Sequence, residues 1–218
     1  MSKQEIIKDS PLKYVGYIER EIFKEASFKA VLSQPGTGKT AFLVQIALYN
    51  MLNDKNVIHI SLNNSVNKVA LWYDEVFYNI LNHAGKAKEN NKIIEDILPH
   101  RLIMTFGDFH ASKIKEALLN LKAQNIFFPK MILIDGVLPS SGIIQELINL
   151  KEIVSNFSID TWISIRENGL FNKGIIEPFD CAIELNATNK DINMSILKGK
   201  EVTIPLKLEL STFILKNN

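Results

Sequence analysis

The stretch Ser33-Gln-Pro-Gly-Thr-Gly-Lys-Thr40 follows the apolar run Phe28-Lys-Ala-Val-Leu32 and leads into a helical pattern that continues to Leu52. The glycines at positions 36 and 38 let successive backbone N–H groups turn inward around an anion, because a Cβ there would block the turn. The N-terminus of the following helix also favours anions. A buried strand, a glycine-rich loop and a helix in this order predict a phosphate-binding loop in an α/β fold.

The polar residues of this loop have expected roles toward a nucleoside triphosphate. Lys39 is expected to reach the terminal phosphates, and the Thr40 hydroxyl is expected to bind Mg²⁺. The residues expected to surround the nucleotide are Ser33, Gln34, Pro35, Gly36, Thr37, Gly38, Lys39, Thr40 and Ala41. The usual pattern opens with glycine, and we expect the small side chain of Ser33 to fit in its place. The predicted cofactors are therefore ATP, or a related nucleotide such as GTP, and Mg²⁺.

The composition is that of an ordinary globular protein. Of 218 residues, 46% are hydrophobic and 22% are charged, which is enough for one substantial core. We expect one domain over residues 1–218, with residues 1–25 as an amphipathic helical arm broken near Pro11. The formal net charge of +1 provides no global attraction to nucleic acid, so charge neither supports nor excludes DNA binding.

Several classes of protein are disfavoured by simple counts. Cys181 is the only cysteine, so no internal disulfide framework is expected, and the four histidines show no metal-ligand spacing. The start of the chain lacks the apolar region of a signal peptide. No run reaches the roughly 18 to 20 apolar residues that span a membrane. We therefore expect a soluble, cytoplasmic protein.

Strand and helix patterns alternate through the first three quarters of the chain. Strands are expected at 28–32, 56–62, 101–105, 130–135 and 161–165, and helices at 40–52, 66–81, 93–98, 112–123 and 143–155, with a polar surface connection at 84–91. This alternation predicts a three-layer α/β core with a mostly parallel sheet. Three further strands at 181–185, 192–198 and 206–215, without helices between them, predict a C-terminal antiparallel β meander.

The apolar strand Met131-Ile-Leu-Ile-Asp135 ends in a carboxylate. An aspartate at the end of a strand is commonly a turn former. Beside a phosphate-binding loop, however, it is the residue expected to hold Mg²⁺ through water. We therefore predict Asp135 and Thr40 as the metal-binding residues.

Three segments together resemble the ATPase core of RecA, the KaiC-like proteins and the DnaB-type replicative helicases. They are Ser33–Ala47, Ile58–Asn64 and Ile132–Asp135, and the resemblance extends roughly over residues 28–215. In DnaB-type helicases the matching loop often opens with a small residue other than glycine, as it does here. The resemblance implies a RecA-like P-loop NTPase core that binds ATP and Mg²⁺.

The resemblance also implies an active site shared between subunits. Ser195-Ile-Leu-Lys-Gly-Lys-Glu-Val-Thr-Ile-Pro205 looks like the closing hairpin of the family, in which two basic residues reach the nucleotide of the adjacent subunit. Lys198 and Lys200 occupy these positions. Such a cation can contribute about 10³ to 10⁵ in rate. The alternative interpretation is that the two lysines are simply part of a solvated strand face. If they act in trans, the active form is a homo-oligomeric ring or filament.

One expected catalytic group is missing. In the resembling families the second strand ends with a glutamate that polarises the attacking water, commonly after a Ser-Leu pair, and this chain has Asn63 after Ser61-Leu62. An amide cannot act as a general base at neutral pH, and a general base is typically worth about 10² to 10⁴ in rate. Slow or absent hydrolysis is therefore expected unless another carboxylate substitutes, for which Asp74, Glu75 and Asp108 are weak candidates.

Two other features have alternative interpretations. Arg166 ends the strand after the Mg²⁺-binding one, where the relatives often place a phosphate-sensing residue; the alternative is a surface ion pair with Glu167. Trp72, Tyr73, Phe77 and Tyr78 are predicted to pack their helix rather than to stack on a base.

Three functions compete. The first is an ATP-binding protein with weak or absent turnover that works as a nucleotide-dependent assembly or regulatory protein. The second is an active DNA-dependent ATPase of the DnaB-type helicase or recombinase class, and the third is an interaction module with an inert loop. The loops expected to face the centre of a ring, around 136–142 and 167–178, offer only Lys173 and the adjoining Arg166 as cations and Phe171 as an aromatic. Channels that track a DNA strand generally need more of both, so the first function is favoured.

Overall fold

The computed structural model describes residues 3–17, 23, 27–83, 85, 90–167, 173–187, 192–198, 203–204, 206–209, 212 and 214–217. Its strands are β1 Phe28–Ser33, β2 Val57–Ser61, β3 Arg101–Thr105, β4 Met131–Val137, β5 Asp160–Arg166, β6 Cys181–Ala187, β7 Ile192–Lys198, β8 Thr203–Ile204, β9 Leu206–Glu209 and β10 Ile214–Asn217. Its helices are α1 Lys3–Lys8, α2 Lys39–Leu52, α3 Val66–His83, α4 Asn90–Ile97, α5 Ala111–Gln124 and α6 Ile143–Asn156, with 3₁₀ turns η1 Pro11–Val15, η4 Leu98–His100 and η5 Lys173–Ile176.

The main sheet has the strand order β3-β2-β4-β5-β1-β6-β7-β8. From β3 to β6 the neighbours run parallel, whereas β7 and β8 each pair antiparallel with the strand before them. The strands β1, β2, β4 and β5 are almost entirely buried, as expected for parallel strands that are covered on both faces. The predicted α/β class and the mostly parallel sheet are confirmed.

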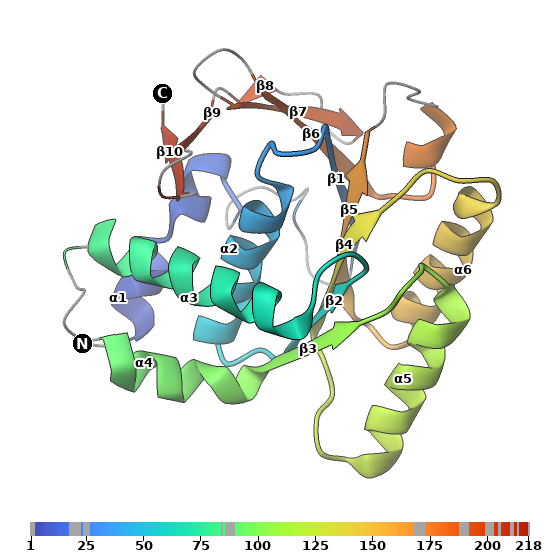
Figure 1. Cartoon of the computed structure of the whole chain (residues 1–218), viewed down its shortest axis with the longest axis horizontal. Coiled ribbons are helices and arrows are strands. Elements are labelled where there is room, and N and C mark those ends of the chain that lie inside the picture. The colour runs from blue at the N-terminus through green and yellow to red at the C-terminus, as the bar shows by residue number, and fades with distance from the viewer. Residues whose placement is uncertain are drawn as a thin grey trace.

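Helices cover both faces of the sheet, which gives three layers (Figure 1). On one face α2 and α3 pack over an apolar cluster that includes Phe42, Tyr73 and Trp162. On the other face α5 and α6 pack over a second cluster that includes Ile114 and Leu147. Because the carboxyl ends of the parallel strands lie at one edge, the segments after β1, β2, β4 and β5 meet there.

The C-terminal region differs from the prediction. The single strand predicted at 206–215 is wrong, because this segment contains β9 and β10, which pair antiparallel in a separate two-stranded sheet. The third strand of the meander is the short β8, which pairs with β7. β10 lies against η1, α2 and α3, and buries Ile214 and Leu215 in the core. Burial of these two side chains stabilises β10 against the helices, which a single strand continuing along the main sheet would not provide.

The N-terminal segment forms part of the core. The predicted break near Pro11 is present, because α1 ends at Lys8 and η1 begins at Pro11 with Ser10 as its N-cap. Ile6 and Leu12 are fully buried beside α2. The described part of the predicted arm therefore covers one end of the core. Residues 18–22, residues 24–26 and most of the predicted connection at 84–91 lie outside the described residues.

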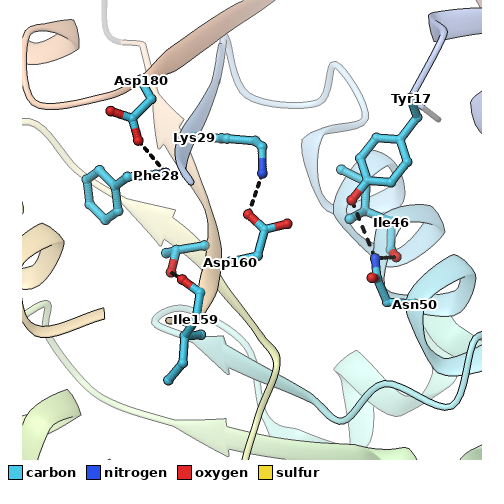
Figure 2. Close-up of polar contacts among 9 residues, drawn as sticks. Tyr17, Phe28, Lys29, Ile46, Asn50, Ile159, Asp160 and Asp180 are labelled. Atoms are coloured by element: carbon cyan, nitrogen blue, oxygen red, sulfur yellow. Dashed lines mark hydrogen bonds and ion pairs between the residues drawn. The ribbon is translucent and has the colours of Figure 1, made fainter. Parts of the chain in front are cut away.

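A buried ion pair joins β1 to β5 at their amino ends, far from the phosphate-binding loop. Figure 2 shows the Lys29 ammonium donating to the carboxylate of Asp160. Burial lowers the pKa of Lys29 and raises that of Asp160. Nearby, Asp180 accepts a hydrogen bond from Phe28 N at 2.8 Å (Figure 2). These contacts fix the starts of β1 and β5, and so the position of the loop that β1 carries at its other end.

Candidate nucleotide site

The loop after β1 has the backbone that its glycines predict. Gly36 and Gly38 have φ angles of +81° and +88°, in the region that other residues rarely adopt. Gly38 is the N-cap of α2, so the helix N-terminus points its free N–H groups into the loop. The side chain of Ser33 is buried and contacts the hydroxyl of Thr37. The loop thus accommodates a serine at the position where the usual pattern has glycine.

The Lys39 ammonium lies inside the loop. It donates to Ser33 O and Ser33 Oγ, both at 2.7 Å, and to Gln34 O at 2.8 Å. The pKa of Lys39 is lowered to about 8, mainly by burial; the charge of nearby Asp135 raises this pKa and that of Arg166 lowers it. A bound phosphate would oppose this effect, because an adjacent negative charge favours the protonated amine. An anionic ligand in the loop would therefore stabilise the protonated form of Lys39.

Asp135 is held by two hydroxyl groups from different elements. Thr40 at the start of α2 donates to Asp135 Oδ2 at 2.7 Å, and Ser164 on β5 donates to Oδ1 at 2.5 Å. Ser164 Oγ in turn accepts a hydrogen bond from Gly136 N at 2.8 Å. The structure thus brings together the two residues predicted to bind metal and adds Ser164, which sequence reasoning missed.

Thr40 and Asp135 fit a magnesium ion. Both present hard oxygen atoms, and Mg²⁺ in phosphate sites is usually held by one or two carboxylates together with phosphates and water. Among the described residues, no group of three or more His, Cys, Asp and Glu side chains forms a metal cage. The pair would therefore hold the ion jointly with the nucleotide and solvent.

Asn63 lies beside Gly136, the residue that follows Asp135, the carboxylate predicted to hold Mg²⁺. Its Nδ2 donates to Gly136 O at 2.9 Å, and a Cβ added to Gly136 would lie only 2.1 Å from that nitrogen. Asp135 and Ser61 are register partners on neighbouring strands, so the segment that follows β2 begins beside the last residues of β4. Asn63 therefore occupies the edge at which a water-activating group would be expected, with an amide in place of a carboxylate.

A cavity of about 450 Å³ joins these residues. Its lining comes from the loop, from the ends of β2, β4 and β5, and from α3: Pro35, Gly36, Thr37, Gly38, Lys39, Thr40, Ala41, Asn63, Asn64, Trp72, Val76, Asp135, Gly136, Ser164 and Arg166. This volume lies within the usual range of about 300 to 1,000 Å³ for small-molecule sites. Trp72 packs against the core as predicted, yet it also lines this cavity, which helical spacing alone could not show.

Two solved structures share this fold. One is described as an ATPase domain and superposes with a TM-score of 0.70 and 15% identity over 89% of this chain and 86% of that chain. The other is described as "The Structure Of A DnaB-Like Replicative Helicase And Its Interactions With Primase", with a TM-score of 0.64 and 15% identity. It is matched over 85% of this chain and 56% of its own length. The chain has a RecA-like α/β fold.

By sequence, the chain matches no protein-family model and no curated protein. The likeness to the two solved structures is therefore one of fold. Among the described helices, none is both long enough and apolar enough to cross a membrane.

In the RecA-like fold of this chain, Arg166 lies next to the phosphate-binding loop. It pairs in register with Ser33, its side chain is exposed, and it lines the cavity. The following residue, Glu167, donates its backbone N–H to Ser33 O at 2.9 Å. Arg166 is therefore within the region where a phosphate-sensing cation would act, and this role stays a prediction.

Of the two lysines predicted to act in trans, Lys198 lies within the described residues. Lys198 ends β7, where its ammonium donates to Glu177 O at 2.5 Å and lies 3.8 Å from the Glu177 carboxylate. It does not line the cavity of its own RecA-like domain. Lys200 lies outside the described residues, as do residues 168–172 of the predicted central loop. The trans role of both lysines stays a prediction.

The three weak candidates for a substitute base do not line the cavity. Asp74 and Glu75 are on the exposed face of α3. Asp108 is exposed and pairs with Lys113 at 2.7 Å and with His110 at 3.1 Å. The carboxylate that does line the cavity is that of Asp135, which the Thr40 and Ser164 hydroxyls already engage.

Proposed function

We propose that this chain binds ATP together with Mg²⁺, hydrolyses it slowly or not at all, and works as a nucleotide-dependent assembly or regulatory protein. The proposal is carried by one juxtaposition: Asn63 Nδ2 lies 2.9 Å from Gly136 O, in the same cavity as the Thr40–Asp135 pair. The binding groups are therefore together, and the group beside them cannot accept a proton at neutral pH.

Binding is supported by the loop and its cation. Gly36 and Gly38 turn the backbone around the space at the N-terminus of α2, and the Lys39 ammonium reaches into the loop. These groups recognise phosphate rather than a base, so they account for affinity toward a nucleoside triphosphate without choosing ATP over GTP. ATP is preferred here because the ATPase domain described above shares the fold.

Weak turnover is supported by the cavity lining, in which Asp135 is the one carboxylate that the described residues provide. The loss of a general base typically lowers a rate by about 10² to 10⁴. None of Asp74, Glu75 and Asp108 lines the cavity to replace it. A protein that retains the bound triphosphate can use it as a structural ligand; Lys198 and Lys200 are the groups through which a second copy would contact it.

The test is a titration of the whole chain with ATP and Mg²⁺, in which heat, phosphate release and mass in solution are all measured. Binding without release and with an increase in mass supports the proposal. Lys39→Ala is the matched control that should lose binding. The absence of ATP binding would refute the proposal, and fast release stimulated by DNA would replace it with an active DNA-dependent ATPase.

A further inference from the structure

Trp72 is the large aromatic side chain of α3 that lines the nucleotide cavity. It is partly exposed and stands one turn before Val76, which lines the same cavity and is 1% exposed. The ammonium of Lys68, one turn earlier, lies 5.5 Å from the centre of the Trp72 indole. An apolar wall is thus built into one side of a site whose other side is a phosphate cradle.

The neighbours of Trp72 fix the rotation of α3. The Tyr73 hydroxyl is hydrogen-bonded to His59 Nδ1 at 3.0 Å in the core, and the Arg101 guanidinium lies 4.8 Å from the centre of the Tyr73 ring. Leu71, the residue before Trp72, is 65% exposed. Because successive helix residues point about 100° apart, these contacts hold Trp72 at the border between core and solvent, over the cavity.

This wall stands at the metal end of the site. α3 begins at Val66, directly after the segment of Asn63 and Asn64, and both asparagines line the cavity. Asn63 is hydrogen-bonded to Gly136, the residue after Asp135, whose carboxylate is proposed to hold the metal ion. In a phosphate-binding loop the metal ion accompanies the terminal phosphates, so a bound nucleotide would place its terminal phosphate on the side of the cavity where α3 begins.

We propose that Trp72 covers the terminal phosphate of the bound nucleotide and excludes water from it. The indole carries one N–H donor and no acceptor, so it can neither activate water nor accept its proton. It also fills space that an attacking water would need, and exclusion of water strengthens the electrostatic hold of Lys39 on the phosphates. The inference rests on the proposed ATP binding and adds a second cause of slow turnover, separate from Asn63.

The two tryptophans of the chain provide the first test. Trp162 is fully buried in the core, so acrylamide quenches its fluorescence poorly, whereas Trp72 is partly exposed and open to the quencher. ATP with Mg²⁺ should abolish the accessible component and leave only the buried one. ADP, which lacks the terminal phosphate, should protect Trp72 much less, and Trp72→Phe should show no nucleotide-dependent component. Calorimetry on the same samples separates the outcomes: ATP binding with unchanged quenching overturns the role of Trp72 alone, whereas no ATP binding overturns it together with the proposed function.

Water exclusion has a kinetic test in the background of Asn63→Glu. The double variant Asn63→Glu/Trp72→Ala should release phosphate faster than Asn63→Glu alone, because water then reaches the terminal phosphate. The matched control Asn63→Glu/Leu71→Ala changes the neighbouring residue, which does not line the cavity, and should leave the rate of Asn63→Glu unchanged. A rate for the Trp72→Ala double variant at or below that of Asn63→Glu would overturn the water-excluding role.

Discussion

Replacing Asn63 by glutamate introduces a carboxylate beside the Thr40–Asp135 pair. The present amide donates to Gly136 O at 2.9 Å. A carboxylate only accepts hydrogen bonds at neutral pH, so it cannot keep this contact and is repelled by the carbonyl oxygen. The longer glutamate side chain must therefore turn away from Gly136 and toward the cavity, which is where a base for the attacking water is needed.

Two effects set the expected change in the rate of phosphate release: the hydrogen bond between Asn63 and Gly136 is lost, and a general base is gained. Loss of a single exposed hydrogen bond costs about 0.5 to 1.5 kcal/mol of folding stability, which a stable domain tolerates. A positioned base typically contributes about 10² to 10⁴ in rate, which is about 2.7 to 5.4 kcal/mol of barrier. We expect phosphate release to rise by about 10², the lower end of that range, because the residues around position 63 do not hold a carboxylate in place.

The assay is single-turnover phosphate release with ATP and Mg²⁺, and the matched control is Asn63→Gln. Glutamine has the length of glutamate and lacks its basicity, so its rate should equal that of the parent chain. Calorimetry must show ATP binding for all three proteins. An unchanged rate for Asn63→Glu in a protein that still binds ATP would refute the placement of Asn63 opposite the terminal phosphate.

Three further outcomes concern the groups around and beneath the site. Ser164→Ala should lower the free energy of unfolding by about 1.5 to 3 kcal/mol and weaken Mg²⁺-dependent ATP binding, because Asp135 loses a buried hydrogen bond to a charged group; an unchanged urea midpoint and affinity would contradict it. Burial lowers the pKa of His59 to about 4, so only the unfolded chain takes up this proton between about pH 6.5 and 4. As the pH decreases through that window, the free energy of unfolding should decrease by about 3 kcal/mol. In urea unfolding at pH 7 and pH 5, His59→Gln should make the free energy of unfolding less dependent on pH. Asp160→Asn should cost about 3 to 5 kcal/mol in urea unfolding because Lys29 stays buried without its counter-ion, and restoration of much of that loss by the double change Lys29→Met/Asp160→Leu would support this cause.

The part of the fold that sequence predicts well is local. β1, the loop and α2 are contiguous, and the glycines of the loop determine its backbone whatever lies elsewhere. The strands β2 to β5 are short apolar runs between helical patterns, so their order of appearance is readable from periodicity. For the same reason Asp135 could be proposed from its place at the end of the predicted strand 130–135, although β4 continues to Val137.

The rest depends on contacts between distant parts of the chain. Ser164 is an ordinary residue of β5 in sequence and becomes important only because β5 lies beside β4 in the sheet. Trp72 shares the helical spacing of core residues, and no pattern indicates that the cavity lies next to it. The division of residues 206–217 into β9 and β10 follows from burial of Ile214 against α2 and η1, which a single apolar stretch does not reveal.

The contacts of Lys198 bear on the assembly role proposed for the site. Within its own chain the ammonium is held by Glu177, through one carbonyl and a carboxylate 3.8 Å away, and both side chains are substantially exposed. An exposed ion pair of this kind contributes about 0 to 1 kcal/mol, whereas a hydrogen bond between two ionised groups is roughly twice as strong as a neutral one. A phosphate presented by a second copy can therefore displace Glu177, but a copy without nucleotide offers no such gain. Under the proposed function, in which Asn63 and Trp72 both favour retention of the triphosphate, slow hydrolysis would prolong the contact between copies, so slow turnover and assembly would be two consequences of the same site.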